Sequence, residues 1–152
     1  MKPATQLKQG NFLIFLGLFL LFLGLFIGLF IHNFANPRMG LSAHLEGVMN
    51  GMFLIIMGLL WKRLMLSKGW LSFAYWLALY GTFSNFIAVL ISAISGSGKM
   101  MPIAGGQEGA PAIENLISFL LISLALSMLT VCILALWGFY KHMKHATDKV
   151  AL

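Results

Sequence analysis

Four long apolar stretches, separated by short polar connections, constrain the fold of this chain more than any other feature. They cover approximately residues 11–34, 41–61, 70–95 and 116–140 of the 152. Each reaches the ~20 residues that an α-helix needs to cross the hydrocarbon core of a bilayer. A helix satisfies its own backbone groups in lipid, and no strand-like alternation interrupts these stretches. The sequence therefore predicts an all-α membrane protein, a single four-transmembrane-helix bundle over residues 1–152.

The composition indicates that the partner of this chain is the lipid bilayer. Hydrophobic residues make up 60% of the chain, and there are ten Lys and Arg against four Asp and Glu. A soluble domain of this length needs more charged surface. The net charge of +6 does not indicate a nucleic-acid partner, because eight of the ten basic residues lie at the chain ends or between the second and third stretches. Arg38 and Lys99 fall on the opposite side, so the positive-inside rule predicts both termini in the cytoplasm.

The sequence also argues against a cleaved signal peptide, a thiol oxidoreductase and a small multidrug exporter. The first stretch is predicted to be a retained helix, because its apolar run is too long for a signal peptide and no small-residue cleavage site follows it. Cys132 is the single cysteine, so neither a disulfide nor the Cys-x-x-Cys motif of a thiol oxidoreductase is present. A small multidrug exporter needs a carboxylate in its first span, and this first span has none.

A polar cluster occupies the beginning of the second apolar stretch. His44, Glu46 and Asn50 lie in its first turns. Ionisable and amide side chains are costly inside a membrane span, and they therefore mark functional sites by default. Ser42 is predicted to cap the helix, with Glu46 near the positive end of the helix dipole. We expect the functional site in this segment.

Helical periodicity divides this cluster between two faces. His44, Gly47 and Gly51 share one face, at offsets of three and seven residues. Two positions without side chains next to a histidine are predicted to leave room for a flat object along the helix. Glu46 and Asn50, four residues apart, occupy an adjacent face and are predicted to be hydrogen-bonding partners.

The other stretches add small and polar residues. Gly24 and Gly28 form a small-xxx-small pair, which predicts the close approach of another helix. Asn85, in the third stretch, is interpreted as a residue that holds helices together. Tyr80 is interpreted either as a packing aromatic or as a group that handles protons. The glycine-rich connection 96–115 lies on the same side of the membrane as the polar cluster, and it is predicted to cover a site.

Several residues of the polar cluster have two interpretations. His44 is either a polar residue at the membrane interface or an axial ligand of haem iron, for which neutral imidazole is a common donor. A second ligand at His32 would make the chain an electron-transfer cytochrome. Glu46 is either a partner of the helix dipole or a proton donor. Asn50 either joins helices or contacts a substrate, and we favour the substrate contact.

The segment 36–51 resembles a known family. It reads Asn-Pro-Arg-Met-Gly-Leu-Ser-Ala-His-Leu-Glu-Gly-Val-Met-Asn-Gly. This run is long and unusual in composition, and it is similar to the corresponding segment of the bacterial hydroxylaminobenzene mutases. Those are small four-span membrane enzymes that convert hydroxylaminobenzene to 2-aminophenol. The resemblance implies an isomerase that acts on a small aromatic substrate in a bacterial inner membrane.

A more distant similarity is to styrene oxide isomerase. It rests on Ala43-His44 and, six residues after the histidine, on Asn50-Gly51. That enzyme has four spans, assembles as a trimer and holds ferric haem b between protomers through the matching histidine. Carried over, the similarity implies a homo-oligomer with haem b as cofactor, His44 as its axial ligand with Gly47 beside it, and Asn50 as an orienting group.

The chain departs from styrene oxide isomerase in the third stretch. The isomerase has a catalytic aspartate and a catalytic tyrosine there. The matching positions hold Gly81 and Val89, or Tyr80 and Ala88 after a shift of one residue. The resemblance therefore favours mutase chemistry. An epoxide isomerase that yields an aldehyde, a haem electron carrier and a non-enzymatic membrane subunit remain as alternatives.

The resemblance also implies a mechanism. Ferric iron held by His44 would act as a Lewis acid on the hydroxylamine oxygen, without redox turnover. Asn50 would orient the substrate, and Glu46 or Tyr80 would transfer protons. Arg38 would pair with a haem propionate near the membrane surface, because a guanidinium matches carboxylate geometry. The aromatic ring would lie in a dry apolar pocket.

Overall fold

The computed structural model describes residues 3–102, 105 and 107–150. Lys2 and residues 103, 104 and 106 of the predicted cover lie outside this part of the chain. The elements, in chain order, are α1 (Pro3–Gly28), η1 (Ile31–Asn33), α2 (Pro37–Leu60), η2 (Trp61–Arg63), α3 (Lys68–Ser95) and α4 (Pro111–Val150).

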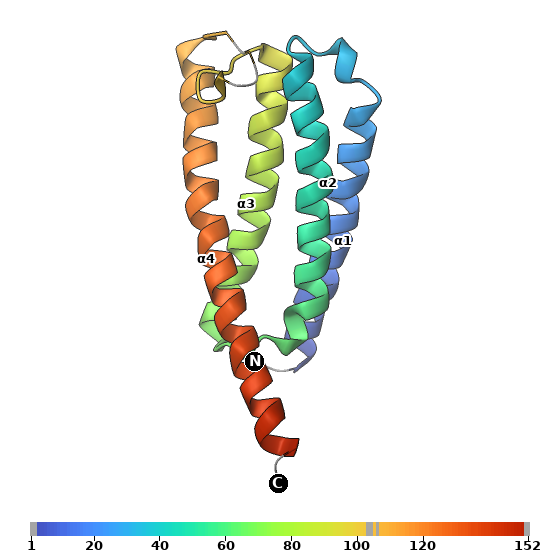
Figure 1. Ribbon diagram of the computed structural model, residues 1–152, viewed down its shortest axis with the longest axis vertical. Helices are drawn as coiled ribbons and strands as arrows, with labels where there is room; N and C mark the ends of the chain where they lie inside the picture. Colours follow the sequence, from blue (N-terminus) through green and yellow to red (C-terminus); the bar gives the residue numbers. More distant parts are fainter. Residues whose placement is uncertain (1–2, 103–104, 106, 151–152) are drawn as a thin grey trace.

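Four antiparallel helices form the whole described architecture (Figure 1). The main packing joins neighbours in sequence, α1 with α2, α2 with α3 and α3 with α4, and the contact between α1 and α2 is the most extensive. Each of the four helices is long and apolar enough to cross a membrane. The predicted all-α, four-span membrane fold is confirmed.

The start of α2 differs from the prediction. The helix begins at Pro37, and its cap is Asn36, whose Oδ1 accepts hydrogen bonds from the backbone N–H groups of Arg38 at 3.1 Å and Met39 at 3.2 Å. The prediction that Ser42 caps the helix is wrong, because an Asn followed by Pro at the first helical position is a stronger start signal. Ser42 instead donates to the Arg38 carbonyl one turn earlier.

The ends of α1 and α4 also differ from the apolar stretches. α1 ends at Gly28, before the predicted 34, and the chain turns through the short η1. α4 runs from Pro111 to Val150, beyond the predicted 116–140. Apolar composition marks the part of a helix that suits lipid, whereas backbone hydrogen bonding continues into polar residues outside it.

Glycines bring α1 and α2 into direct backbone contact. A Cβ atom on Gly47 would lie 2.5 Å from the Cα of Gly24, closer than any real contact. The close approach predicted at Gly24 is therefore confirmed. The open space predicted beside Gly47 and Gly51 is wrong, because α1 occupies it. The facing glycine pairs are Gly10 with Gly58, Gly17 with Gly51 and Gly24 with Gly47.

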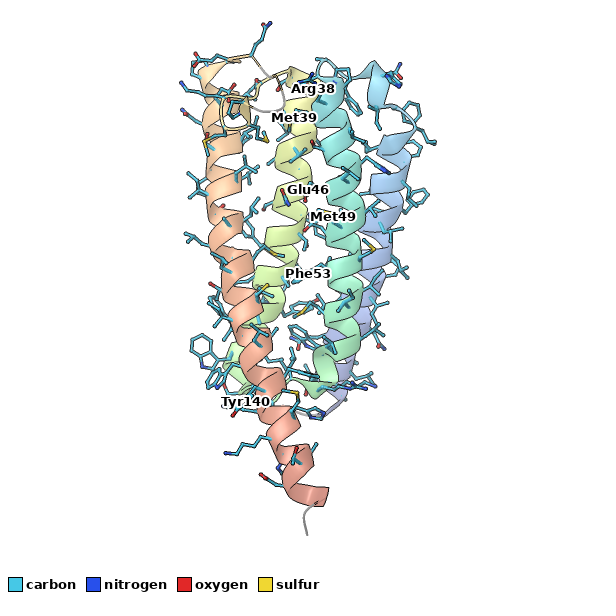
Figure 2. All side chains as sticks on the ribbon, in the orientation of Figure 1. Arg38, Met39, Glu46, Met49, Phe53 and Tyr140 are labelled. Atoms are coloured by element: carbon cyan, nitrogen blue, oxygen red, sulfur yellow. The ribbon has the colours of Figure 1, made fainter. Side chains whose placement is uncertain are left out.

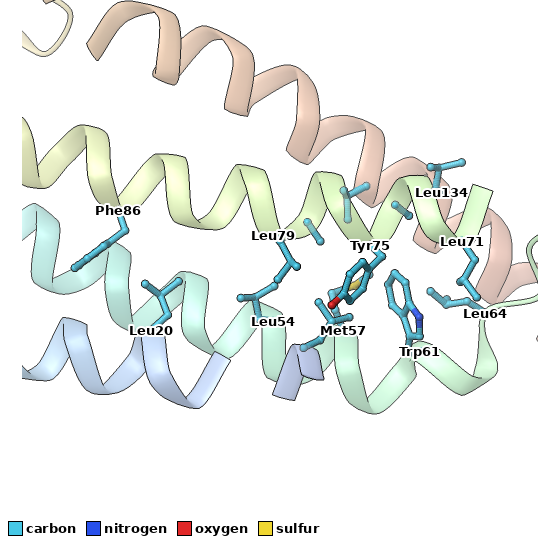
Figure 3. Packing of buried hydrophobic residues seen from close by; sticks show 14 residues of the cluster. Leu20, Leu54, Met57, Trp61, Leu64, Leu71, Tyr75, Leu79, Phe86 and Leu134 are labelled. Atoms are coloured by element: carbon cyan, nitrogen blue, oxygen red, sulfur yellow. The ribbon is translucent and has the colours of Figure 1, made fainter. Parts of the chain in front are cut away.

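A hydrophobic cluster joins the helices from the end opposite η1 to Leu20 and Phe86, past the middle of the bundle (Figure 3). Trp61 is fully buried, packs edge-on against Tyr75 and donates from its indole nitrogen to the Gln9 side chain at 3.3 Å. Leu54 of α2 and Leu79 of α3 extend the cluster toward the middle of the bundle. This packing holds α1, α2 and α3 together independently of the polar residues of α2.

Candidate functional site

A cavity of about 580 Å³ lies between the upper parts of α2, α3 and α4, beneath the connection that joins α3 to α4. Its polar lining comes from Arg38, Ser42, Glu46 and Asn85. Its apolar lining includes Val89 of α3, Leu121 of α4 and methionines of α2 and the connection. A mostly apolar cavity with a few convergent polar groups is the usual form of a small-molecule site.

The polar lining of α2 is a stripe of residues spaced four apart. Arg38, Ser42 and Glu46 line the cavity, and Asn50 continues the spacing one turn deeper. Residues four apart lie on nearly the same face of a helix. In Figure 2, Arg38 lies near the upper end of α2 and Glu46 lies deeper along it. The stripe therefore leads from the mouth of the cavity to the Glu46 carboxyl.

The Glu46 carboxyl is held by two amides from two helices. Its Oε2 accepts a hydrogen bond from Nδ2 of Asn50 at 3.0 Å and from Nδ2 of Asn85 at 2.6 Å. The predicted pairing of Glu46 with Asn50 is confirmed. Within the described residues Oε1 has no hydrogen-bond partner. The half-buried carboxyl thus has one oxygen fixed and one left for a ligand.

Asn85 is the residue whose place the sequence interpretation missed. It does join two helices, as predicted, but it does so at the cavity wall through Glu46. Glu46 lies nine residues after the start of α2 and Asn85 ten residues before the end of α3. At 1.5 Å per residue these are depths of about 14 Å and about 15 Å from the same end. The predicted start of the second span at residue 41 places Glu46 nearer the end than Asn85, so the equal depths appear only with the helix bounds that the structure gives.

His44 lies against α1. Its Nδ1 is 2.9 Å from the carbonyl oxygen of Gly24, and a Cβ on Gly28 would come within 2.6 Å of the same nitrogen. A carbonyl can only accept, so Nδ1 is the donor, and in the neutral form of the ring the lone pair is on Nε2. Nε2 has no hydrogen-bond partner in the part of the chain that the structure describes. A backbone carbonyl on one nitrogen is the arrangement that orients metal-binding histidines.

His44 and Glu46 point to opposite sides of α2. Residues two apart on a helix differ by about 200° in direction. His44 accordingly contacts α1, whereas Glu46 lines the cavity toward α3 and α4. The face of α2 that carries His44 and the face that carries Glu46 were predicted to be adjacent, but they are on opposite sides of the helix. The imidazole of His44 therefore does not line the cavity of the same chain.

The comparisons with known proteins show the family of the chain. The model of the family "Styrene oxide isomerase" matches residues 9–140, which is most of the chain. The chain belongs to the styrene oxide isomerase family. No solved structure matches it.

Two mutases of Ectopseudomonas oleovorans are similar to this family member over most of their length. Hydroxylaminobenzene mutase HabB is 51% identical over 138 residues, which cover 90% of this chain and 84% of HabB. Hydroxylaminobenzene mutase HabA is 42% identical over 130 residues, which cover 84% of this chain and 96% of HabA. At this similarity the chain is an enzyme of the isomerase and mutase class.

Gly81 and Val89 of α3 carry neither an acid nor a phenol in this family member, and each has a packing role. Gly81 packs under Met128, whose sulfur would lie 2.6 Å from an added Cβ. Val89 contributes an apolar wall to the cavity. Among the described residues that line the cavity, Glu46 alone carries a carboxyl group. Glu46 is therefore the one carboxyl available for acid–base chemistry among the described residues that line this cavity.

Tyr80 lies outside the cavity lining. Its phenolic oxygen is 2.6 Å from Oγ of Ser123 on α4. Ser123 already donates to the Phe119 carbonyl at 2.7 Å, so Tyr80 is the donor in this pair. The contact joins α3 to α4, and the proton-transfer role of Tyr80 stays a prediction.

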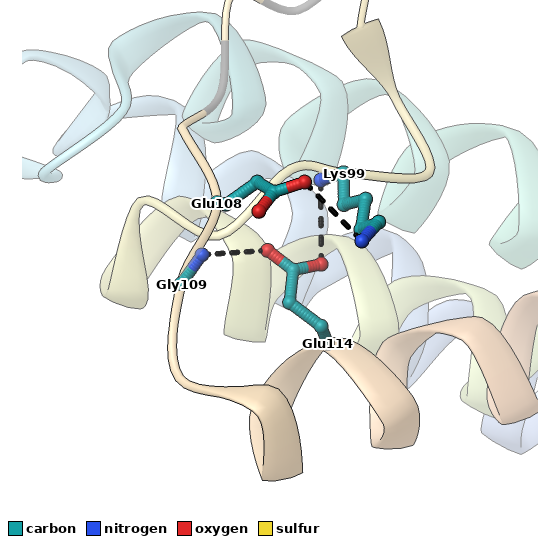
Figure 4. Close-up of polar contacts among 4 residues, drawn as sticks. All are labelled: Lys99, Glu108, Gly109 and Glu114. Atoms are coloured by element: carbon teal, nitrogen blue, oxygen red, sulfur yellow. Dashed lines mark hydrogen bonds and ion pairs between the residues drawn. The ribbon is translucent and has the colours of Figure 1, made fainter.

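The connection above the cavity is tied to the start of α4 (Figure 4). The buried Glu114 accepts hydrogen bonds from the backbone N–H of Gly109 at 2.9 Å and of Lys99 at 3.3 Å. An exposed ion pair of 3.2 Å joins Lys99 to Glu108. Met100, between these contacts, lines the cavity with its neighbours, so the predicted cover is confirmed for the described residues.

Proposed function

We propose that this family member rearranges an aryl hydroxylamine, hydroxylaminobenzene, to an aminophenol within the membrane. The observation that carries the proposal is the carboxyl group of Glu46, the one carboxyl among the described residues that line a largely apolar cavity. Its relatives at 51% and 42% identity are named for hydroxylaminobenzene. An aromatic hydroxylamine partitions into lipid, which fits an enzyme that lies in the membrane.

The proton balance of this rearrangement needs one group that both accepts and donates. Substrate and 2-aminophenol contain the same atoms: the nitrogen–oxygen bond breaks, and an oxygen–carbon bond forms at the ortho carbon. One hydrogen leaves that carbon as a proton, and the nitrogen gains one. A carboxylate that takes the first proton and returns it to nitrogen closes the balance. Glu46, through its unpartnered Oε1, is the group that does this.

We further propose haem b as the cofactor, with His44 as the axial ligand. The donor set fits, because Nδ1 is engaged by Gly24 and the lone pair of Nε2 is available. Bound there, ferric haem would supply Lewis acidity toward the hydroxylamine oxygen. Arg38, which is exposed near the upper end of α2, would pair with a propionate. Gly47 packs against Gly24 of α1, so it has no space beside it for the cofactor, and other residues would surround the haem.

The assembly and the location belong to the same proposal. The homo-oligomer is a trimer by resemblance, and a neighbouring copy would bring the α1 side of one chain near the cavity of another. The membrane is a bacterial inner membrane with both termini in the cytoplasm, because the basic residues gather on that side. The role of Asn50 as an orienting group for the substrate stays a prediction. The contact that the structure gives its amide nitrogen is a hydrogen bond to Glu46.

The substrate proposal predicts selective turnover. Purified enzyme in detergent should convert hydroxylaminobenzene to 2-aminophenol and leave styrene oxide unchanged, because Gly81 and Val89 supply no acid or phenol for epoxide opening. Both products are quantified by chromatography from parallel reactions. Conversion of styrene oxide to its aldehyde, with hydroxylaminobenzene untouched, would instead establish the epoxide isomerase alternative.

The cofactor proposal predicts a haem spectrum that depends on one histidine. The wild-type protein should show a Soret band, and His44→Ala should lose it because the axial donor is gone. His32→Ala is the matched control and should keep the band, since His32 is exposed in η1. Absorbance of the detergent-purified proteins is the measurement. A colourless wild-type protein with full mutase activity would remove haem from the proposal, and loss of the band in both variants would favour the cytochrome alternative.

A further inference from the structure

Two amides converge on the same oxygen of Glu46, and they come from different helices. Asn50 is one turn along α2 from Glu46, and Asn85 is on α3. The contact from Asn85 is the shorter one, 2.6 Å against 3.0 Å. The shorter contact of the carboxyl therefore crosses from one wall of the cavity to another.

We propose that Asn85 is the positioning residue of the Glu46 carboxyl. Its amide nitrogen holds Oε2, so that Oε1 is the oxygen that exchanges protons with the substrate. This inference rests on the proposed function, in which Glu46 carries a proton from the ortho carbon to the nitrogen of the hydroxylamine. Asn85 itself takes no part in the bond changes.

Asn50 does not perform this task by itself. It belongs to the same helix as Glu46, so the two move together and their contact does not fix the carboxyl relative to the other walls. A free glutamate side chain samples many rotamers, and holding it in one conformation costs entropy. The bond from α3 fixes the carboxyl relative to Val89, four residues after Asn85, which forms the apolar wall.

A purely structural role for Asn85 makes a different prediction. An interhelical hydrogen bond in a membrane contributes only modestly to holding two helices together. α2 and α3 are also joined by the hydrophobic cluster that contains Leu54 and Leu79. Loss of the Asn85 bond therefore leaves the two helices packed, and its consequence falls on the carboxyl. Catalysis and stability separate the two roles.

The test is the kinetics of Asn85→Ala with hydroxylaminobenzene. We expect kcat to fall about ten- to a hundredfold, because a hydrogen bond to a charged group is lost, while KM stays within about twofold since the apolar wall that binds the ring is intact. Thr82→Val is the matched control: its hydroxyl bonds within α3, to the carbonyl of Ala78, and it does not touch Glu46. It should keep the wild-type kcat.

A double variant distinguishes positioning from structure. In the Glu46→Gln background, Asn85→Ala should lower the residual rate by less than about twofold, because no carboxyl remains to be positioned. If Asn85 had only a structural role, Asn85→Ala would lower kcat in the Glu46→Gln background by the same factor as in the wild type. Infrared difference spectra between wild type and Glu46→Gln identify the Glu46 carboxyl band. Asn85→Ala should move this band, and Thr82→Val should not.

The outcomes separate this inference from the proposed function. Wild-type kcat in Asn85→Ala, beside an inactive Glu46→Gln, overturns the role of Asn85 alone, and so does an additive loss in the double variant. A fully active Glu46→Gln overturns the proton-transfer role of Glu46 and this inference with it, whereas a wild-type enzyme that does not convert hydroxylaminobenzene overturns the proposed function. If Asn85→Ala does not fold, Asn85→Ser replaces it. The serine side chain is too short for its hydroxyl to reach Oε2 of Glu46, so the same fall in kcat is expected.

Discussion

Replacing Glu46 by glutamine is expected to lower kcat for hydroxylaminobenzene by about a hundredfold to ten-thousandfold, the usual contribution of a positioned acid–base group. Glutamine keeps the size of the side chain and still accepts a hydrogen bond from Asn85, so the cavity keeps its shape. What it loses is the ability to take a proton from the ortho carbon. Product formation by the purified variant, followed by chromatography over long incubations, is the measurement.

Glu108→Gln is the matched control for this prediction. Its carboxyl is exposed on the connection above the cavity and pairs with Lys99. Surface ion pairs contribute about 0–1 kcal/mol, so neither activity nor stability should change measurably. A Glu46→Gln enzyme as fast as the wild type would show that the proton moves through another group, with Tyr80 the next candidate.

Replacing Gly47 by alanine is expected to have the largest effect on stability. The new Cβ would lie 2.5 Å from Cα and 2.9 Å from N of Gly24, and these are backbone atoms that no rotamer change can move. Overpacking of a tight contact costs about 1–3 kcal/mol, and separating α1 from α2 would also break the bond between His44 and the Gly24 carbonyl. The thermal unfolding midpoint in detergent should fall by several degrees.

Gly69→Ala is the control for the glycine contact. It lies near the start of α3, and an added Cβ there meets no atom within 4 Å. Its midpoint should equal or slightly exceed that of the wild type, because alanine favours helix over glycine. Equal midpoints for Gly47→Ala and the wild type would mean that α1 and α2 separate without loss, and the contact would then contribute little.

The two predictions act on opposite sides of one helix. One side of α2 is reserved for contact with α1, through Gly47 and the imidazole of His44. The other side carries the polar stripe that ends at Glu46 and Asn50. Residues close together in sequence thus serve helix packing on one side and the cavity on the other. A substitution that shifts the rotation of α2 would disturb both.

The sequence by itself determined what depends on local periodicity and composition. The number of spans follows from the apolar stretches, because each is long enough to cross a bilayer. The hydrogen bond between Glu46 and Asn50 follows from their spacing of four within one helix. The close helix approach at Gly24 follows from small residues at a spacing of four. These features were predicted, and the structure confirms them.

The tertiary structure decided which faces meet. Gly47 packs against Gly24 and does not face an open space. Asn85 of α3 bonds to Glu46 of the neighbouring α2, and Tyr80 bonds to Ser123 of α4. The periodicity of a helix gives the relative directions of its own side chains, but it leaves free the helix's rotation and depth against its neighbours. Packing between helices fixes those two quantities, and with them which polar residues share a cavity.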